Sequence, residues 1–462
     1  MLFNSLVFLL LFLPVTYIVF WLLRSARGRY VWLTVTGYVF YGYWDARFCL
    51  LMAFSTLVSY TAGRGLLRWT DPRHRRLCLV IPITVDLLLL GFFKYANFGL
   101  DTARQISHWL GHETTLPHLN IILPVGISFY TFHTISYIVD SYRGVVRPTR
   151  NFFEFSAYVS LFSQLVAGPI VRFRQIEADL EALGEATRGR WLYRGITFLG
   201  IGLVQKVLIA DTLAAFVDPA LASYQTLSTV GAWLAMLGYS CQLYFDFSGY
   251  STMAVGLGYM FGLRIPRNFN SPYRALDPSD FWRRWHISLS TCMRDYLYIP
   301  FGGNRGSGLA TVRNLMLTML IGGLWHGAAW TFVAWGAYHG LLLIGYRYVA
   351  PGWDALPTWV RRPGMWVLVV VGWVLFRSRD FTMATSLLGK MFTLTAGALV
   401  PNAPIAVGVL LVAVAWAAAG PDPFEMKQER SLRRDLTLAA AYGASLAIIG
   451  AMRTSPFLYF QF

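Results

Sequence analysis

Long apolar segments without any charged residue recur along the whole chain. Five runs lack Lys, Arg, Asp and Glu altogether: Met1–Leu23, Thr114–Val139, Pro219–Phe245, Asn314–Tyr346 and Met391–Pro421. Since a helix needs about 20 apolar residues to cross the hydrocarbon core of a bilayer, several of these runs are long enough for one crossing, and some for a crossing plus a turn. The pattern predicts an all-α, polytopic membrane protein with about ten or more apolar segments.

Composition supports this class, because 56% of the residues are hydrophobic and only 13% are charged, whereas a soluble domain has about 25% charged residues. The first apolar segment is not expected to be a cleavable signal, because it lacks a basic n-region and no small-x-small cleavage site follows it. The basic residues Arg24, Arg27 and Arg29 come after this segment. The positive-inside rule therefore places the N-terminus outside and this loop in the cytoplasm.

Further basic loops divide the chain into helical elements. The expected membrane helices in the first part are Tyr30–Trp44, Phe48–Gly63, Leu77–Phe93, Ile121–Val139, Gly195–Ala215 and Val230–Leu263. The loops at Arg64–Arg76, Arg143–Arg150 and Lys427–Arg434 are expected in the cytoplasm. The polar stretch Asp101–Asn120 is expected to form an external loop. Three or so further crossings complete the chain.

Three segments depart from simple crossings. Phe155–Val171 is apolar but has arginines on both sides, which favours a re-entrant or partly buried helix that protein or a water-filled cavity must cover. Arg264–Arg313 is too polar to cross lipid and too aromatic for a solvated loop, which predicts short helices and turns that lie at the cytoplasmic interface or dip into the protein. Asn314–Tyr346 is expected to form two helices with a break near Gly322 and Gly323.

The formal net charge of +16 raises the possibility of a nucleic-acid binder. The basic residues lie in short loops between apolar segments, however, so they encode membrane topology, and no nucleic-acid partner is expected. Arg outnumbers Lys by 35 to 4, and Arg is the better partner for carboxylates and phosphates, so some of these residues are candidates for an anionic ligand. The four cysteines form no CxxC or Cys/His cluster, so neither a disulfide framework nor a metal site is expected.

The sharpest local feature is His326, which lies within Gly322–Ala328 in the middle of an apolar run. Ionisable residues within the membrane are costly and are functional by default, although a histidine bonded to a core carbonyl is the simpler alternative. The flanking glycines allow backbone or substrate to approach the imidazole. An imidazole can also take a proton from a hydroxyl near pH 7. These properties make His326 a candidate general base.

The second feature is His286 in Phe281–Ser290, for which an interfacial belt of aromatic residues and arginines is the alternative. It lies 40 residues before His326, so the sequence alone cannot bring the two together. His133 and His339 are expected to be core histidines. Asp246 is expected to pair with an arginine or to cap a broken helix, with a proton relay as the alternative.

Taken together, these motifs resemble a known family. The signature of the membrane-bound O-acyltransferases resembles two parts of this sequence: Trp325–Gly327, and Asp280–His286 running into Arg294–Pro300. The resemblance is closest to the bacterial branch that includes the alginate O-acetylation membrane protein and the teichoic acid D-alanyl transferase. Further matching stretches, which extend the resemblance nearly end to end, are Leu123–Phe132, Val166–Ile170, Asn268–Tyr273 and Ser455–Phe462. Thr252 departs from the family where an acidic residue is expected, and Cys292 where a tryptophan is expected.

The resemblance implies one domain, residues 1–462, with about a dozen transmembrane and re-entrant helices around a central funnel in a bacterial inner membrane. It implies O-acetylation of an exported polysaccharide, as in alginate biosynthesis, from an acetyl-CoA or acyl-carrier thioester on the cytoplasmic side. No tightly bound cofactor and no metal are expected. An extracytoplasmic SGNH-hydrolase-like acetyltransferase and polysaccharide export machinery are expected partners.

Within this resemblance, His326 is expected to act as general base and His286 to orient the donor or polarise its carbonyl. The Arg-rich stretch lies on the side where a phosphate-bearing donor would dock, so its arginines are predicted to bind the donor: Arg283, Arg284, Arg294 and Arg305. Two alternatives remain: D-alanyl or other acyl transfer to an envelope polymer, lipid or protein, and a transporter without chemistry. The sequence contains no internal repeat, although many transporters are built from repeats.

Overall fold

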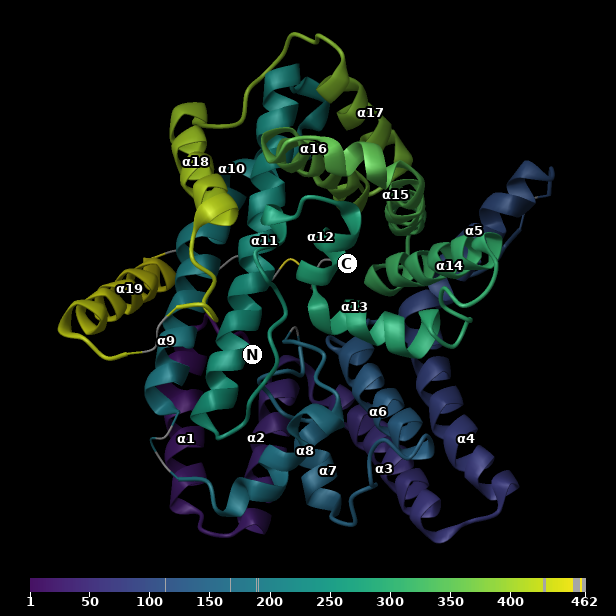
Figure 1. Ribbon diagram of the computed structural model, residues 1–462, viewed down its shortest axis with the longest axis vertical. Coiled ribbons are helices and arrows are strands. Elements are labelled where there is room, and N and C mark those ends of the chain that lie inside the picture. Colours follow the sequence, from purple (N-terminus) through teal and green to yellow (C-terminus); the bar gives the residue numbers. More distant parts are fainter. Residues whose placement is uncertain are drawn as a thin grey trace. The chain divides into compact units, whose positions relative to one another are not determined.

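A computed structural model gives the structure of the protein (Figure 1). It describes residues 1–451 apart from 113, 167, 188, 190, 427 and 428, and it also describes residue 458. These residues form helices joined by turns and contain no β-strand, only an isolated bridge between Leu227 and Ala398. The all-α fold class is therefore confirmed.

The chain divides into two compact units. Unit 1 consists of Met1–Ile196 and Ala254–Pro266, and unit 2 of Thr197–Met253 and Arg267–Phe462. The single domain and the central funnel concern the arrangement of the whole chain and stay predictions.

Unit 1 contains most of the first two hundred residues. Its helices are η1 (Val7–Phe12), α1 (Leu13–Leu22), α2 (Ala26–Asp45), α3 (Arg47–Arg68), α4 (Pro72–Leu90), η2 (Gly91–Tyr95), α5 (Ala96–Trp109), α6 (Ile127–Tyr142), α7 (Phe152–Val159), α8 (Phe173–Glu181) and η3 (Ala182–Gly184). A polar contact joins α3, α4 and α6, which pack against one another. Asp86 on α4 accepts hydrogen bonds of 2.6 Å from Ser55 on α3 and from Thr134 on α6. This carboxylate is buried and is compensated by both hydroxyls.

Several basic loops that are predicted to be cytoplasmic meet at one end of unit 1. Arg75, at the start of α4, donates to the carbonyl of Tyr142 at the end of α6 over 3.3 Å. The hydroxyl of Tyr60 on α3 donates to the carbonyl of Arg150 over 2.7 Å. These contacts bring the α3–α4 and α6–α7 loops together, as the topology requires, while the side of the membrane on which they lie stays a prediction.

Unit 2 is built around the long helix α11. Its helices are α9 (Leu192–Leu203) and α11 (Thr229–Met260), both shared with unit 1, and η4 (Val204–Ala210), α10 (Asp211–Ala222), η5 (Tyr224–Thr226), η6 (Pro272–Arg274), α12 (Pro278–Arg284), α13 (Ile287–Met293), η7 (Arg294–Tyr298), α14 (Gly308–His326), α15 (Trp330–Ala355), α16 (Thr358–Arg377), α17 (Phe381–Phe392), α18 (Ala403–Ala419) and α19 (Leu432–Ala451). The short elements from η6 to η7 confirm the helices and turns that the sequence predicts for Arg264–Arg313. At the start of α12, the side chain of Asp277 accepts from the backbone N–H of Asp280 and caps the helix.

Both units contain helices that could cross a membrane. Among the described residues, five helical segments are long and apolar enough to cross a bilayer: Arg47–Arg68, Pro72–Trp109, Leu192–Ala222, Gly308–His326 and Thr358–Arg377. Val7–Leu22 and Ala403–Ala419 are shorter apolar helices. The larger number of crossings expected from the apolar runs stays a prediction.

Two sequence-based boundaries were wrong. The expected loop Asp101–Asn120 begins within α5, which is helical to Trp109 because its polar residues lie on one face of an amphipathic helix. The break expected near Gly322 and Gly323 lies further on, between α14 and α15. Gly323 is instead a packing position, since a Cβ there would collide with the carbonyl oxygen of Phe332. It allows α14 and α15 to pack closely against each other.

The expected re-entrant segment Phe155–Val171 is helical only at its start, in α7. Its remaining described residues are irregular and buried, as a non-helical backbone in a membrane protein must be. Ala167 of the motif at Val166–Ile170 lies outside the described residues. The same holds for Lys427 and, apart from Leu458, for the closing motif Ser455–Phe462.

Candidate active site

His326 is the last residue of α14 in unit 2, directly before the turn to α15. Its side chain is buried among aromatic rings. The imidazole centroid lies 5.0 Å from those of Trp325 and Trp335 and 5.3 Å from that of Phe376. This setting shields the imidazole from bulk water, so its electrostatic interactions with a bound group are stronger than in solvent.

Trp285 is the C-cap of α12, and His286 is the single residue between Trp285 and the start of α13 at Ile287. Its backbone is left-handed, with φ of 43° and ψ of 54°, and its side chain is fully buried. This conformation is uncommon outside glycine, although histidine adopts it more often than most residues. Because it costs on the order of 1 kcal/mol or more, it persists where the surroundings fix it, and such positions cluster at functional sites.

A polar network holds the His286 ring. Asn268 Oδ1 lies 3.0 Å from His286 Nδ1 and accepts from the backbone N–H and the hydroxyl of Ser288, at 3.2 and 2.8 Å. The side-chain amide of Asn268 donates to Ser251 Oγ on α11 over 3.1 Å. The backbone N–H of Ile287 donates to the carbonyl of Asn268 over 2.8 Å. Both the main chain and the side chain of Asn268 are therefore attached to the start of α13.

The two candidate catalytic histidines lie in one site. Their ring centroids are 6.4 Å apart and their planes are inclined by 58°. The ring of Trp325 lies beside both, with its centroid 6.1 Å from that of His286. Phe247 on α11 contacts His286 edge to face, with centroids 4.7 Å apart. Two imidazoles at this separation can act on the same bound group, which the sequence could not establish.

The four candidate arginines differ in their surroundings. Arg284 Nε donates to Asp280 over 2.9 Å and Nη1 donates to the carbonyl of Asn270 over 3.2 Å. Arg283 lies 3.5 Å from Asp280, and its side chain is 65% exposed. Arg284 is therefore largely engaged by the protein, whereas most of Arg283 faces outward.

The other two arginines lie near η7 and the turn that follows it. Arg294 pairs with its neighbour Asp295 over 2.8 Å, and its side chain is 59% exposed. Arg305 is exposed in the turn around Gly302 and Gly303, both of which have positive φ. Such exposed guanidinium groups are accessible to an anionic ligand, since a neighbouring carboxylate in solvent holds them only weakly.

The remaining membrane histidines lie in cores, as the sequence predicts. His133 in unit 1 is fully buried and lies beside Tyr158, with ring centroids 5.6 Å apart. His339 in unit 2 is buried against Trp335 and Phe281, with centroid distances of 4.9 and 6.1 Å. Neither is in ring contact with the His286–His326 pair among the described residues.

Asp246 corrects one expectation. It pairs with Lys206 over 2.5 Å, not with an arginine, and α11 continues unbroken past it. Lys206 also reaches Asp211 over 2.7 Å, and the backbone N–H of Leu458 donates to Asp246 over 3.0 Å. Sequence reasoning missed Lys206. The signal was present, because a lysine within the expected crossing Gly195–Ala215 requires a nearby acid.

The two departures from the family pattern lie in buried positions. The Thr252 hydroxyl donates to the carbonyl of Ser248 over 2.7 Å and lies 3.3 Å from Gln205 Oε1. Cys292 is fully buried on α13. Within the part of the chain that the structure describes, no group of three or more His, Cys, Asp or Glu could hold a metal ion.

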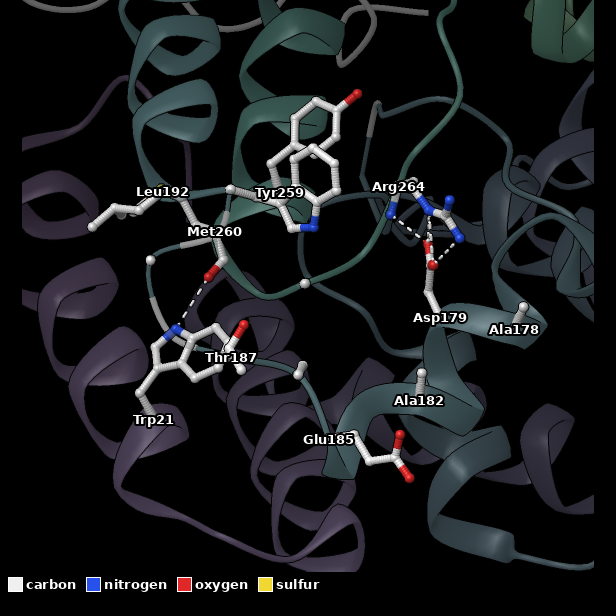
Figure 2. Close-up of a pocket in the computed structure, with 14 residues that line it drawn as sticks. Trp21, Ala178, Asp179, Ala182, Glu185, Thr187, Leu192, Tyr259, Met260 and Arg264 are labelled. Atoms are coloured by element: carbon white, nitrogen blue, oxygen red, sulfur yellow. Dashed lines mark hydrogen bonds and ion pairs between the residues drawn. The ribbon is translucent and has the colours of Figure 1, made fainter. Parts of the chain in front are cut away.

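A separate cavity of about 330 Å³ lies within unit 1 (Figure 2). On one wall, the indole N–H of Trp21 donates to the carbonyl of Met260 over 3.2 Å. On another, Arg264 binds Asp179 over 2.5 Å, and these hydrogen bonds raise the pKa of the Arg264 guanidinium. The lining contains neither of the candidate histidines. Two charged groups of the lining, Arg264 and Asp179, are thus paired with each other, whereas Glu185 also lines the cavity. No motif in the sequence pointed to this cavity.

Comparison with known proteins supports one family. The model of the membrane-bound O-acyltransferase family matches residues 144–378, which include both histidines and all four candidate arginines. A probable alginate O-acetylase of Pseudomonas aeruginosa is 47% identical over 400 residues, covering 85% of this chain and 75% of that protein.

More distant relatives act on other envelope polymers, as their names state. A peptidoglycan O-acetyltransferase of Helicobacter pylori is 35% identical and covers 85% of this chain and 80% of its own length. A teichoic acid D-alanyltransferase of Bacillus subtilis is 31% identical over 265 residues, covering 55% of this chain and 66% of its own. The similarity is thus greater to the O-acetylase of alginate than to the D-alanyltransferase.

Proposed function

The chain belongs to the membrane-bound O-acyltransferase family, and from this premise we propose that it transfers an acetyl group from a cytoplasmic thioester towards an extracytoplasmic hydroxyl. The proposed role is O-acetylation of an exported polysaccharide such as alginate. The similarity to the Pseudomonas aeruginosa O-acetylase supports both the acetyl group and the polysaccharide.

The observation that carries the proposal is the buried pair His286 and His326, with ring centroids 6.4 Å apart. A thioester is already activated, so the enzyme has to position it, keep water away and deprotonate the attacking hydroxyl. The imidazole of His326 at the end of an apolar helix can deprotonate the hydroxyl. The aromatic rings of Trp325 and Trp335 around it exclude water from the thioester.

In the proposed reaction His326 is the general base. It takes the proton of the acceptor hydroxyl as the oxygen attacks the thioester carbonyl, and a new C–O bond forms. The C–S bond then breaks as the tetrahedral adduct collapses, and His326 returns the proton to the thiolate that leaves. Atoms and charge balance without a metal or redox partner. His286 supports this step by orienting the donor beside His326.

For the donor we propose acetyl-CoA, with an acyl-carrier thioester as the alternative source of the same chemistry. Both bear phosphate, and Arg holds phosphate through two parallel charge-assisted hydrogen bonds. Arg283, Arg294 and Arg305 have exposed side chains that suit this task. Arg284 is held by Asp280, so it serves as support for the segment.

The proposed setting is a bacterial inner membrane, with the donor in the cytoplasm. The acceptor is either the polysaccharide itself or an extracytoplasmic SGNH-hydrolase-like acetyltransferase that passes the group on, next to the polysaccharide export machinery. The D-alanyltransferase among the relatives makes D-alanyl transfer the second acyl group to test.

The test is a transfer assay with the purified full chain in sealed proteoliposomes. Radiolabelled acetyl-CoA is supplied on one side, and an oligosaccharide of the exported polymer is supplied on the other. We expect label on the oligosaccharide hydroxyls, and loss of that label in His326→Ala. His133→Ala is the control, because it truncates another buried histidine, which packs beside Tyr158 in unit 1.

The outcomes separate the alternatives. If label is transferred only from a D-alanyl carrier protein, the transferred group is D-alanyl and not acetyl. If label appears in lipid or protein, the acceptor is that molecule and not the polysaccharide. Intact donor moved across the membrane without cleavage would indicate a transporter. Full transfer by a well-folded His326→Ala protein would overturn the assignment of the base.

A further inference from the structure

We infer that Asn268 is a positioning residue, which holds neutral His286 with its proton on Nδ1 so that Nε2 carries a lone pair and acts as a proton acceptor. The effect on catalysis rests on the proposed function. The protonation pattern of the ring itself does not, because it can be measured without any substrate.

The contacts of the Asn268 amide identify the atom that faces His286. The backbone N–H of Ser288 points at this atom over 3.2 Å, and a backbone N–H can only donate. The atom is therefore the amide oxygen, Oδ1. The amide nitrogen then faces Ser251 Oγ at 3.1 Å, where a hydroxyl can accept.

The proton of the His286 ring then belongs on Nδ1. Oδ1 of Asn268 is an acceptor, and His286 Nδ1 lies 3.0 Å from it. An unprotonated Nδ1 would set two lone pairs against each other at this distance, whereas a protonated Nδ1 makes a hydrogen bond of ordinary length. The Ser288 hydroxyl lies closer to Oδ1, at 2.8 Å, than to Nδ1, at 3.4 Å, so it also donates to the oxygen.

The main chain also fixes Asn268 beside His286. Two backbone hydrogen bonds join the segment of Asn268 to the α12–α13 connection: Ile287 N–H to the carbonyl of Asn268 at 2.8 Å, and Asn270 N–H to the carbonyl of Arg284 at 2.9 Å. The left-handed backbone of His286 turns its ring towards Asn268 between these two bonds. Asn268 thus lies at a fixed distance from Nδ1 through its main chain as well as its side chain.

The position of this proton limits what the other ring nitrogen of His286 can do. The His286 ring is fully buried, which disfavours its charged form. A neutral imidazole has one protonated nitrogen, so His286 with a proton on Nδ1 has none on Nε2. It can then accept a hydrogen bond but cannot donate one to the carbonyl of a thioester. Of the two roles expected for His286, the geometry favours orientation, by accepting from an N–H of the donor or of the His326 ring, over polarisation of the carbonyl.

The experiment is nitrogen NMR on the full chain, labelled with ¹⁵N-histidine and reconstituted in lipid. Protonated and unprotonated ring nitrogens resonate in well-separated ranges, and the His286 signals are identified among the eight histidines by their loss in His286→Gln. We expect the Nδ1–H form in the parent protein. Asn268→Asp keeps an acceptor oxygen and should retain that form, whereas Asn268→Leu should shift His286 towards the Nε2–H form.

Asn314→Leu is the matched control. Asn314 is another buried asparagine of unit 2, and its amide donates to the carbonyl of Gly303 over 3.0 Å. Its replacement removes a buried hydrogen bond as Asn268→Leu does, but it should leave the His286 resonances in place. A purely structural role of Asn268 would make the two leucine variants alike in this spectrum.

The kinetic readout links the ring to the reaction. In Asn268→Leu we expect kcat for acyl transfer to fall about ten- to a hundredfold, as when a residue that orients a functional histidine is removed, with the donor KM changed less than about threefold. Asn268→Asp should recover part of the loss. An Nε2–H form of His286 in the parent protein would overturn the inference, and this result does not depend on whether Asn268→Leu folds. An unchanged His286 spectrum in a folded Asn268→Leu protein would also overturn it. Absence of acyl transfer by the parent protein would instead count against the proposed function.

Discussion

The imidazole rings of His286 and His326 lie with their centroids 6.4 Å apart, although 40 residues separate them in the sequence. Groups that act on one reacting centre show strongly non-additive mutational effects. We therefore predict that His326→Gln lowers kcat by about 10²–10⁴-fold, the usual range for loss of a general base. The double variant with His286→Gln should be no more than a few-fold slower than His326→Gln alone.

Steady-state kinetics on the parent protein, both single variants and the double variant would test this coupling, with the yield of detergent-purified protein as the check on folding. If the two single losses multiply in the double variant, the histidines act independently. A common site would then be the wrong interpretation of their proximity.

The sequence identified both histidines but not what holds them. His326 was found because an ionisable residue in an apolar run between glycines is rare. Asn268 was missed as a partner of His286, because their contact depends on a left-handed residue at 286 and on two backbone hydrogen bonds that have no pattern in the sequence. Lys206 could have been paired with Asp246, since each is a charge in an apolar segment.

The fold was predictable to a similar extent. Charge-free runs predicted the helices, because each must satisfy its own backbone in lipid. The end of α14 was misplaced because a Gly-Gly pair looks the same whether it breaks a helix or admits a neighbouring one. In the structure Gly323 does the latter, and the helix ends at His326.

That difference leads to a prediction for stability. Gly323→Val should destabilise the protein by about 1–3 kcal/mol, because its side chain would force the backbone of Phe332 away in a packed helix pair. Gly322→Ala is the matched control, since a Cβ there would meet no atom of the described residues within 4 Å. It should be neutral or stabilising by up to about 1 kcal/mol through helix propensity. Thermal unfolding in detergent measures both, and equal effects at the two glycines would contradict the packing role.

The buried charges of unit 2 give another prediction. Lys206→Met leaves the carboxylates of Asp246 and Asp211 in a buried site without their cation, which should cost about 3–5 kcal/mol. Adding Asp246→Asn should recover part of this loss, because it removes one uncompensated charge. Arg47→Gln breaks an exposed pair with Asp45 and should leave the unfolding temperature unchanged. Lys206→Met that unfolds like the parent protein would show that the triad contributes nothing to stability.

The exposed arginines are predicted to bind the donor. If Arg283, Arg294 or Arg305 grips a phosphate, its change to Gln loses a charge-assisted contact worth about 1.5–3 kcal/mol. The donor KM should then rise about ten- to a hundredfold, since each 1.4 kcal/mol is a factor of ten. Arg284→Gln should instead lower the unfolding temperature, because Arg284 joins Asp280 to the carbonyl of Asn270.

Steady-state kinetics on the four Gln variants distinguishes donor binding from anchoring. An arginine that only anchors the chain at lipid headgroups contributes about 1 kcal/mol of surface attraction and leaves the donor KM alone. High salt should also weaken donor binding to the parent protein, since exposed charges are screened. Unchanged donor KM in all four folded variants would place the donor site elsewhere.

The basic loops predict the orientation of the chain. In a Cys49→Ser background, where the other native cysteines are buried, single cysteines at the exposed positions Arg27, Arg147 and Arg430 should be protected from an impermeant thiol reagent added to intact cells. Permeabilisation should expose all three, which shows that they are accessible once the reagent reaches the cytoplasm. A cysteine at His108, exposed on α5 in the stretch expected outside, should react from outside without permeabilisation. Labelling of Arg27→Cys in intact cells would show that this loop lies outside. The predicted topology would then be wrong, and so would the side from which the donor is proposed to enter.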